Sequence, residues 1–256
     1  MRRISTCLAV LGLAVLGLSA TASAAPTVTL KAAAVPIPVN PKQKNGPTIP
    51  GTGNILGAGA DLETEFKIKG TEYGGFPSPL KKIKLIFPPG VGLHNQGFAT
   101  CTETTLKEKG PAGCPTKSYA SALGEAGGVV SFGVERVHEN VTVQGFFTPG
   151  GGLIFLAAGT TPVSLEILSK GSVVSEGGHE VGTAEVPLIE TVPGALDASA
   201  EFIKVKLGAG YKKGKKVVSY GTLPKKCKGT LKIMAEVSFY SGETVPVSYK
   251  APCPKK

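Results

Sequence analysis

The chain has 256 residues, is rich in glycine (35) and proline (20), lacks tryptophan and carries a formal net charge of +10. Beyond residue 25 it holds one arginine, Arg136, and two aspartates, Asp61 and Asp197. These numbers argue against calcium cages built from clustered aspartates, and against specific nucleic-acid recognition by arginine forks.

Residues 1–25 have the order of a secretory signal peptide. Two arginines precede an apolar run over residues 8–18, and small residues follow it up to Ala24 and Ala25. A run of about 11 residues is too short to span a bilayer, which takes about 20. We expect cleavage after Ala24 or Ala25, no transmembrane segment in the mature chain, and a secreted, extracellular or cell-envelope-associated protein.

Residues 26–56 contain six prolines, too many for a helix or a central strand. We therefore predict a Pro-rich, extended N-terminal segment there. From residue 57 the pattern changes to short β-rich runs, such as "DLETEFKIKG", separated by turn signals every ten or so residues. Residues 57–256 are predicted to form an all-β, antiparallel β-sandwich, Ig-like or jelly-roll-like, with roughly ten to twelve strands. One domain and two β subdomains are both compatible with this length.

The stretch "CTETTLKEKGPAGCP", residues 101–115, predicts the one short helix, within 102–110. Thr102 is a good N-cap, and Gly110 followed by Pro111 ends the helix. A bridge between Cys101 and Cys114 would staple this excursion to the β domain.

No sequence motif predicts a catalytic residue or a cofactor. His138-Glu139 and His179-Glu180 are adjacent pairs, and neighbours on a strand face opposite ways, so neither pair forms an acid/base couple unaided. The apolar residues of 146–156 could line a ligand cavity, although a buried core is the favoured interpretation.

Charge is uneven along the chain. Residues 101–200 hold five basic and 11 acidic residues, whereas residues 201–256 hold 13 lysines and three glutamates. The lysines could contact a polyanion, for example an anionic cell-wall polymer or polysaccharide, or they could merely keep sheet edges soluble, which is the favoured interpretation. The candidate contact residues are Lys212, Lys213, Lys215, Lys216, Lys225, Lys226 and Lys228.

The last two strands predict their own register. Apolar residues occupy odd positions over both 231–239 and 245–249, and a two-residue turn would send the two sets to opposite faces. A three-residue loop, 240–242 with Gly242 left-handed, aligns them and places Cys253 opposite Gly229.

Four cysteines remain after the leader, Cys101, Cys114, Cys227 and Cys253, and an even number in an exported chain indicates disulfides. Three pairings are conceivable, and short loops favour Cys101–Cys114 with Cys227–Cys253. Zinc would want closer ligand spacing, and thioredoxin-like redox chemistry wants Cys-x-x-Cys, so no metal site is expected.

Several phrases, including "IPGTGNILGAGADLETEFKIKGTEYGGFPSPL", "VSFGVERVHE", "FFTPGGGLIF" and "YKAPCPKK", resemble a group of uncharacterised exported actinobacterial proteins. The resemblance covers nearly the whole mature chain. It implies a recurrent secreted unit, and it implies no activity, cofactor or catalytic residue.

The sequence thus predicts a secreted or envelope-associated β-sandwich with a structural, adhesive or binding role. One alternative is a glycan- or polyanion-binding module that uses the Lys-rich C-terminal third. Another is a hydrolase without a recognisable motif, which would need two carboxylates, or a base and a nucleophile, brought together in a pocket.

Overall fold

A computed structural model of the chain describes residues 25–36, 60–132, 134–213 and 216–253. The predicted leader and its cleavage point after Ala24 lie outside these residues. The described strands and the α-helix are β1 (Thr27–Pro36), β2 (Ala60–Lys69), β3 (Leu80–Ile86), β4 (Gly92–Leu93), α1 (Glu103–Lys109), β5 (Gly124–Phe132), β6 (Glu135–Phe147), β7 (Leu153–Gly159), β8 (Leu165–Glu176), β9 (His179–Glu185), β10 (Ser199–Leu207), β11 (Gly210–Lys213), β12 (Lys216–Ser219), β13 (Gly221–Thr222), β14 (Thr230–Phe239) and β15 (Thr244–Pro252). Three short 3-10 turns occupy Pro111–Gly113, Thr116–Ser118 and Pro149–Gly151.

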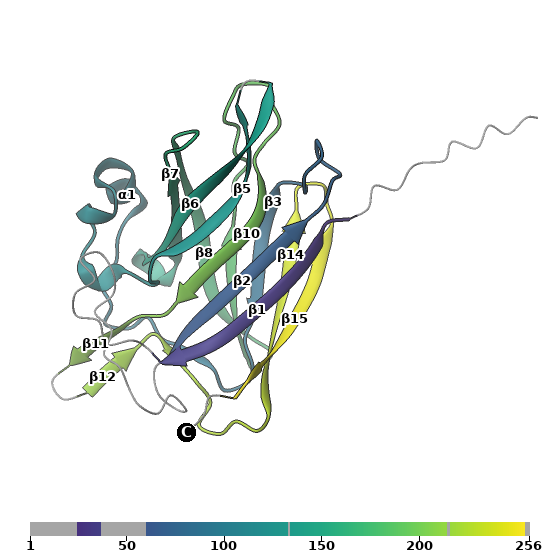
Figure 1. Cartoon of the computed structure of the whole chain (residues 1–256). Coiled ribbons are helices and arrows are strands. Elements are labelled where there is room, and N and C mark those ends of the chain that lie inside the picture. The colour runs from purple at the N-terminus through teal and green to yellow at the C-terminus, as the bar shows by residue number, and fades with distance from the viewer. Residues whose placement is uncertain (1–24, 37–59, 133, 214–215, 254–256) are drawn as a thin grey trace, which may run out of the picture.

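Eleven strands form one antiparallel sheet in the order β1-β2-β10-β5-β6-β7-β8-β9-β3-β14-β15. The sheet curls until its two edge strands, β1 and β15, contact each other, which makes a nearly closed barrel (Figure 1). The antiparallel, all-β prediction is confirmed, and the sandwich is corrected to a barrel. Strand patterns report which side chains face inward, but sheets that stack and a sheet that closes on itself share that alternation.

The C-terminal hairpin has the predicted register. Ser238 pairs with Thr244 and Thr230 with Pro252, so the loop holds an odd number of residues, and Gly242 has φ of 101°. The odd-numbered side chains of β14 all face the core as a consequence, with Ala235 and Val237 almost wholly buried. Cys253 N–H donates to the Gly229 carbonyl at 3.0 Å, and the Cys227–Cys253 disulfide closes the open end of the hairpin.

Strand β1 lies inside the segment that proline content assigned to an extended N-terminal lead. It pairs with β2 along its whole length, from Thr27 opposite Lys69 to Pro36 opposite Ala60, so the barrel begins well before residue 57. The prolines stand at the limits of the strand, where a missing N–H costs no ladder bond, and β1 is an edge strand. Residues 37–59, with the other prolines, lie outside the described part of the chain.

The two halves of the barrel differ in how their interiors are filled. We call β1, β2, β3, β14 and β15 the packed half. Their inward side chains interdigitate into a cluster whose members are at most 8% exposed: Leu30, Ala32, Phe66, Ile68, Leu80, Ile83, Ile233, Ala235, Val237, Phe239 and Ala251. We call β5 to β10 the hollow half, because its inward side chains surround a cavity.

The predicted helix covers the outer face of the hollow half. Thr102 accepts a hydrogen bond from the Thr105 N–H at 3.1 Å, and Gly110, with φ of 61°, ends α1, as predicted. Leu106 is fully buried against side chains that β6 and β7 direct outward, Phe146, Ile154 and Leu156. The Cys101–Cys114 disulfide holds this excursion in place, so the predicted pairing is confirmed for both bridges.

Candidate ligand-binding cavity

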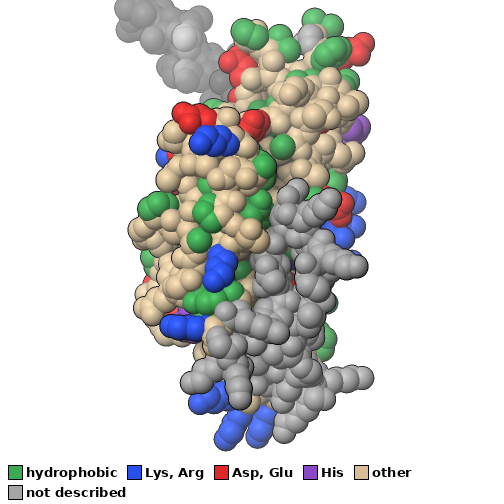
Figure 2. All heavy atoms as spheres, turned by 90° about the vertical axis from the view of Figure 1, so that its left-hand side faces the viewer, with side chains coloured by type: hydrophobic (Ala, Val, Ile, Leu, Met, Phe, Trp, Pro, Cys, Tyr) green, Lys and Arg blue, Asp and Glu red, His purple; other side chains and the backbone are tan. Residues whose placement is uncertain are grey.

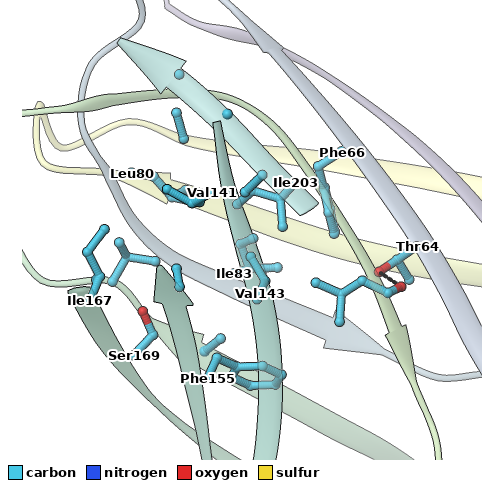
Figure 3. Close-up of a pocket in the computed structure, with 18 of the residues that line it drawn as sticks. Thr64, Phe66, Leu80, Ile83, Val141, Val143, Phe155, Ile167, Ser169 and Ile203 are labelled. Atoms are coloured by element: carbon cyan, nitrogen blue, oxygen red, sulfur yellow. Dashed lines mark hydrogen bonds between the residues drawn. The ribbon is translucent and has the colours of Figure 1, made fainter. Parts of the chain in front are cut away.

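A cavity of about 210 Å³ lies inside the barrel, and eight strands contribute to its wall. Side chains from β2, β3, β6, β7, β8 and β10 point into one common space (Figure 3). The labelled residues are Thr64, Phe66, Leu80, Ile83, Val141, Val143, Phe155, Ile167, Ser169 and Ile203. Because Phe66, Leu80 and Ile83 also belong to the packed core, β2 and β3 form the partition between the two halves.

Small residues at inward positions create the cavity. Strands β5, β7 and β9 place glycine or alanine where the packed half has branched or aromatic side chains: Ala126, Gly128, Ala157, Gly182 and Ala184. Phe155, Ala157 and Ile167 consequently remain partly exposed although they point inward. A barrel of eight strands is just wide enough for side chains to fill, so an eleven-stranded barrel either flattens or encloses space. This one encloses space in its hollow half.

Phe155 is placed by glycines on both neighbouring strands. A Cβ added to Gly145 of β6 would come within 3.1 Å of the Phe155 ring, and one added to Gly171 of β8 within 3.0 Å. The ring therefore lies over the bare backbone of both strands and forms an aromatic part of the cavity wall. Glycine within a strand often marks a place where another group approaches the backbone closely, and here the approaching group is the Phe155 ring.

Five lining residues carry a polar side-chain atom, and three of them already bond within the protein. Thr64 donates to the Val205 carbonyl, Thr183 bonds the exposed Ser172, and Ser199 accepts from Arg136. Ser169 lies among apolar neighbours, with its oxygen visible in Figure 3, and no partner is described for it. The fifth is Glu139, and the rest of the wall is apolar.

Glu139 is the one ionisable side chain in the described wall of the cavity, and it is only 3% exposed. Its Oε2 accepts a hydrogen bond from the Val163 N–H at 3.1 Å, which fixes the turn between β7 and β8. Its Oε1 is buried and has no hydrogen-bond partner in the described structure. That oxygen occupies the space beside Gly159, where an added Cβ would lie 2.6 Å from it. One carboxyl oxygen of a residue in the cavity wall is thus left without a hydrogen-bond partner in the described part of the chain.

The partner strand presents backbone to this carboxyl group. Glu139 stands opposite Gly128 in the β5–β6 ladder, and a Cβ added to Gly128 would collide with the Ser199 carbonyl of β10. Glu139 lies near the start of β6, at the end of the barrel that carries the β5–β6 hairpin and is uppermost in Figure 1. Ser169 pairs across the ladder with Phe155, which pairs with Gly145, six residues further along β6 than Glu139. Glu139 and Ser169 therefore lie at different levels of the cavity.

Arg136 lies on the opposite face of the same strand, outside the wall. Its guanidinium stacks near the rings of Tyr73 and Phe76, at 5.8 and 5.2 Å from their centroids, and donates to the Asp197 carbonyl and to Ser199 Oγ. Burial lowers its pKa, while Tyr73 and Asp197 act in the opposite direction. Because residues three apart on a strand face opposite sides, Arg136 does not neutralise Glu139 from within the cavity.

A second, smaller cavity of about 40 Å³ lies near the other end of the barrel and includes Asp61. Asp61 is 1% exposed, and its Oδ1 has no hydrogen-bond partner in the described structure. The pKa of this carboxyl group is raised from 3.8 to about 7, chiefly by burial and also by the nearby Glu63, while Lys206 acts in the opposite direction. An added Cβ on Gly208 would collide with Asp61, so only glycine fits beside the buried carboxyl.

The predicted lysine site is only partly described. Lys213, Lys225, Lys226 and Lys228 are exposed, and no ion pair is described for them. Lys215 lies outside the described residues, as do the side chains of Lys212 and Lys216. In the face shown in Figure 2, acidic side chains gather towards the top and basic ones towards the bottom. The two ends of the barrel thus carry charges of opposite sign on this face.

The histidines behave as surface or turn residues. His138 Nδ1 lies 3.0 Å from Glu201 Oε2 at an exposed position, and His179 Nδ1 lies 2.7 Å from the Phe87 carbonyl. Among the residues described, no three His, Cys, Asp or Glu side chains gather as a metal ion would require. Across the same part of the chain, no helix combines the length and apolar character needed to cross a bilayer.

The sequence of residues 146–156 fits either cavity wall or core, and the structure divides the stretch between the two. Leu153 and Phe155 line the cavity, whereas Phe146, Ile154 and Leu156 pack under α1. Glu139 was considered only as a neighbour of His138, and its role in the wall was missed. The signal was present in "VHENVTV": Glu139 interrupts the apolar parity of Val137, Val141 and Val143.

No protein-family model, curated protein or solved structure matches this chain. The resemblance to exported actinobacterial proteins is therefore still an expectation.

Proposed function

We propose that the protein is an exported β-barrel binding protein that holds a small, largely apolar molecule in its hollow half. The two disulfides support export, since such bridges persist in oxidising compartments. The observation that carries the proposal is the apolar cavity of about 210 Å³. Ligand sites in proteins are typically apolar cavities with a few placed polar groups, and barrel interiors are a common location.

Energetics favour an occupied cavity. The wall is almost wholly apolar, and each Å² of apolar surface that a ligand removes from water stabilises the complex by about 25 cal/mol. A cavity of about 150 Å³ accepts benzene, so this one has room for on the order of ten non-hydrogen atoms.

The test is binding of n-butylbenzene, which has ten carbon atoms. A ligand of this size reaches micromolar to sub-millimolar Kd, and at ten times Kd it should raise Tm by about 4 °C. Ala157→Leu places a larger side chain in the cavity and should abolish the shift. Ala158→Leu is the matched control, since Ala158 is the next residue of β7 and faces outward. The absence of any shift with the unaltered protein would refute the proposal.

A second candidate function uses exposed lysines in the C-terminal third of the chain. The exposed lysines Lys213, Lys225, Lys226 and Lys228 have no described ion pair, which supports contact with an anionic cell-wall polymer or polysaccharide. Such contact is non-specific and screened by salt. Retention on an acidic polysaccharide at low salt, lost at moderate salt and in a Lys225/Lys226/Lys228→Gln variant, would support it. No retention at low salt removes it.

The hydrolase alternative finds little support in this site. It requires two carboxylates, or a base and a nucleophile, in one pocket. The described wall of the large cavity contains one carboxyl group, Glu139, and neither histidine nor cysteine. Ser169 lies on a different level of the cavity from Glu139, as the strand register shows.

A further inference from the structure

We infer that the cavity selects amphiphiles whose head group donates a hydrogen bond, an amine or a hydroxyl, to Glu139, with the apolar body lying along the hollow half. This inference rests on the proposed function and specifies its ligand class. It depends on one observation above all: a carboxyl oxygen, Glu139 Oε1, that is buried, lies in the cavity wall and has no partner in the described structure.

The unsatisfied oxygen defines the chemistry of the head group. A carboxylate accepts hydrogen bonds and donates none, so the missing partner is a donor. A buried acceptor without a partner is costly, and buried polar atoms are paired in the great majority of proteins. The other oxygen is already used by the Val163 N–H, so the group is held in place rather than free to turn towards solvent. A ligand amine or hydroxyl would complete it.

The wall next to Oε1 is built largely from backbone. Oε1 itself fills the space beside Gly159 of β7, and the Ser199 carbonyl fills the space beside Gly128 of β5, which stands opposite Glu139. Further along β6, Val141 and Val143 continue the wall with apolar surface, and Phe155 closes it from β7. A ligand with one polar end and an apolar body matches this order of contacts.

Exposed carboxylates at this end act in the same direction. Two exposed glutamates, Glu135 and Glu190, belong to the hairpin and the loop at the Glu139 end of the barrel. In Figure 2 the upper part of the visible face is likewise the acidic one. A field of this sign attracts cationic head groups and disfavours anionic ones such as fatty-acid carboxylates. Arg136, the nearby cation, donates through Nη2 to Asp197 and Ser199 on the outer face, and its Nε and Nη1 have no hydrogen-bond partner in the described structure.

The experiment compares four probes of nearly equal size by calorimetry: 3-phenylpropylamine, 3-phenylpropan-1-ol, n-butylbenzene and 3-phenylpropanoate. Each is measured against the unaltered protein, Glu139→Gln and Glu166→Gln. Glu166 is the control carboxylate, because it is exposed on the outward face at the same end. A hydrogen bond to a charged group contributes a factor of about 10 to 100 in affinity.

We expect Glu139→Gln to weaken binding of the amine about 10- to 100-fold relative to binding of n-butylbenzene. Binding of the alcohol should weaken less, and binding of the carboxylate should become stronger. Glu166→Gln should change every ratio less than about threefold, since an exposed charge is screened. An amine-to-butylbenzene ratio that is the same in the unaltered protein and in Glu139→Gln overturns this inference but leaves the proposed function standing. Failure of all four probes to bind overturns both.

The control for folding is internal. Glu139→Gln also alters the bond to the Val163 N–H, so the variant could lose stability in the turn between β7 and β8. Unchanged affinity for n-butylbenzene shows that the cavity is intact. If that affinity falls in parallel with the amine, Glu139 acts only by shaping the cavity, and the inference is wrong.

Discussion

Ile233 and Ile167 both point into the barrel from antiparallel strands, yet they meet different surroundings. Ile233 is 3% exposed within the packed half, whereas Ile167 faces the cavity of the hollow half and is partly exposed. One sheet thus contains a close-packed region, which stabilises the fold, and a region that encloses a cavity and is less well packed. The difference lies in side-chain volume at inward positions and not in strand pairing, which is continuous from β1 to β15.

The largest expected effect tests that comparison directly. Ile233→Ala should lower the free energy of unfolding by about 4 kcal/mol, because it opens a void in close-packed surroundings. Ile167→Ala should cost only about 1 to 2 kcal/mol, since part of that side chain contacts no protein atom to begin with. Urea denaturation of both variants measures the two values. Equal losses would show that the hollow half is as well packed as the other.

The disulfides offer a second comparison, because one bridge serves each half. Cys101–Cys114 holds α1 over the hollow half, and Cys227–Cys253 closes the β14–β15 hairpin of the packed half. Loop entropy predicts similar losses on replacing each pair by serine, about 3 and about 3.5 kcal/mol. The location of the loss should differ.

Hydrogen exchange would separate the two disulfide variants. Loss of Cys101–Cys114 should speed exchange in α1 and in residues 114–119 and leave β14 protected, because α1 is too short to hold itself in place. Loss of the other bridge should speed exchange at the open end of β14 and β15. Uniform exchange in both variants would mean that the halves unfold as one unit.

The third prediction concerns Asp61, on the strand that divides the halves. Its pKa in the folded protein, about 7, lies above the ordinary value of 3.8, chiefly because the group is buried. The folded state therefore holds the proton more tightly, so the contribution of Asp61 to stability is greatest at low pH and falls as pH rises from about 4 through about 7. We expect a loss of about 2 kcal/mol between pH 5 and pH 7, given about 1.4 kcal/mol per unit as an upper limit.

Asp61→Asn should remove this dependence, since an amide does not ionise. Denaturation curves at several pH values would show a flat profile for the variant and a falling one for the unaltered protein. Glu166→Gln, at an exposed position, should keep the falling profile. A profile that rises with pH in the unaltered protein would contradict the assignment of the shift to burial.

How far the sequence predicts this molecule depends on the range of the interaction. The Thr102 cap and the odd-numbered loop at Gly242 follow from local patterns, and both were predicted correctly, as were the two disulfides. Closure of the sheet was not, because β1 and β15 meet from opposite ends of the chain. The cavity was likewise hidden, since it arises from small residues on β5, β7 and β9 that no local pattern relates to one another. Glu139 left a local trace, a charge on an apolar strand face, whose meaning depends on what the barrel encloses.

The smallest expected effect is also the one that separates space kept for a ligand from space that packing merely failed to fill. Ala157→Leu adds three carbon atoms where β7 faces the cavity, and burying them should raise the free energy of unfolding by about 1 kcal/mol. Ala158→Leu, on the outward face, should change it by less than about 0.5 kcal/mol. Urea denaturation without ligand measures both. If Ala157→Leu is more stable and no longer binds n-butylbenzene, the unaltered chain gives up stability at Ala157 in order to keep the cavity open. Destabilisation by more than about 1 kcal/mol would mean that Ala157 is already close-packed, and then the contrast between the halves would have to be sought in the β8 and β9 side of the wall.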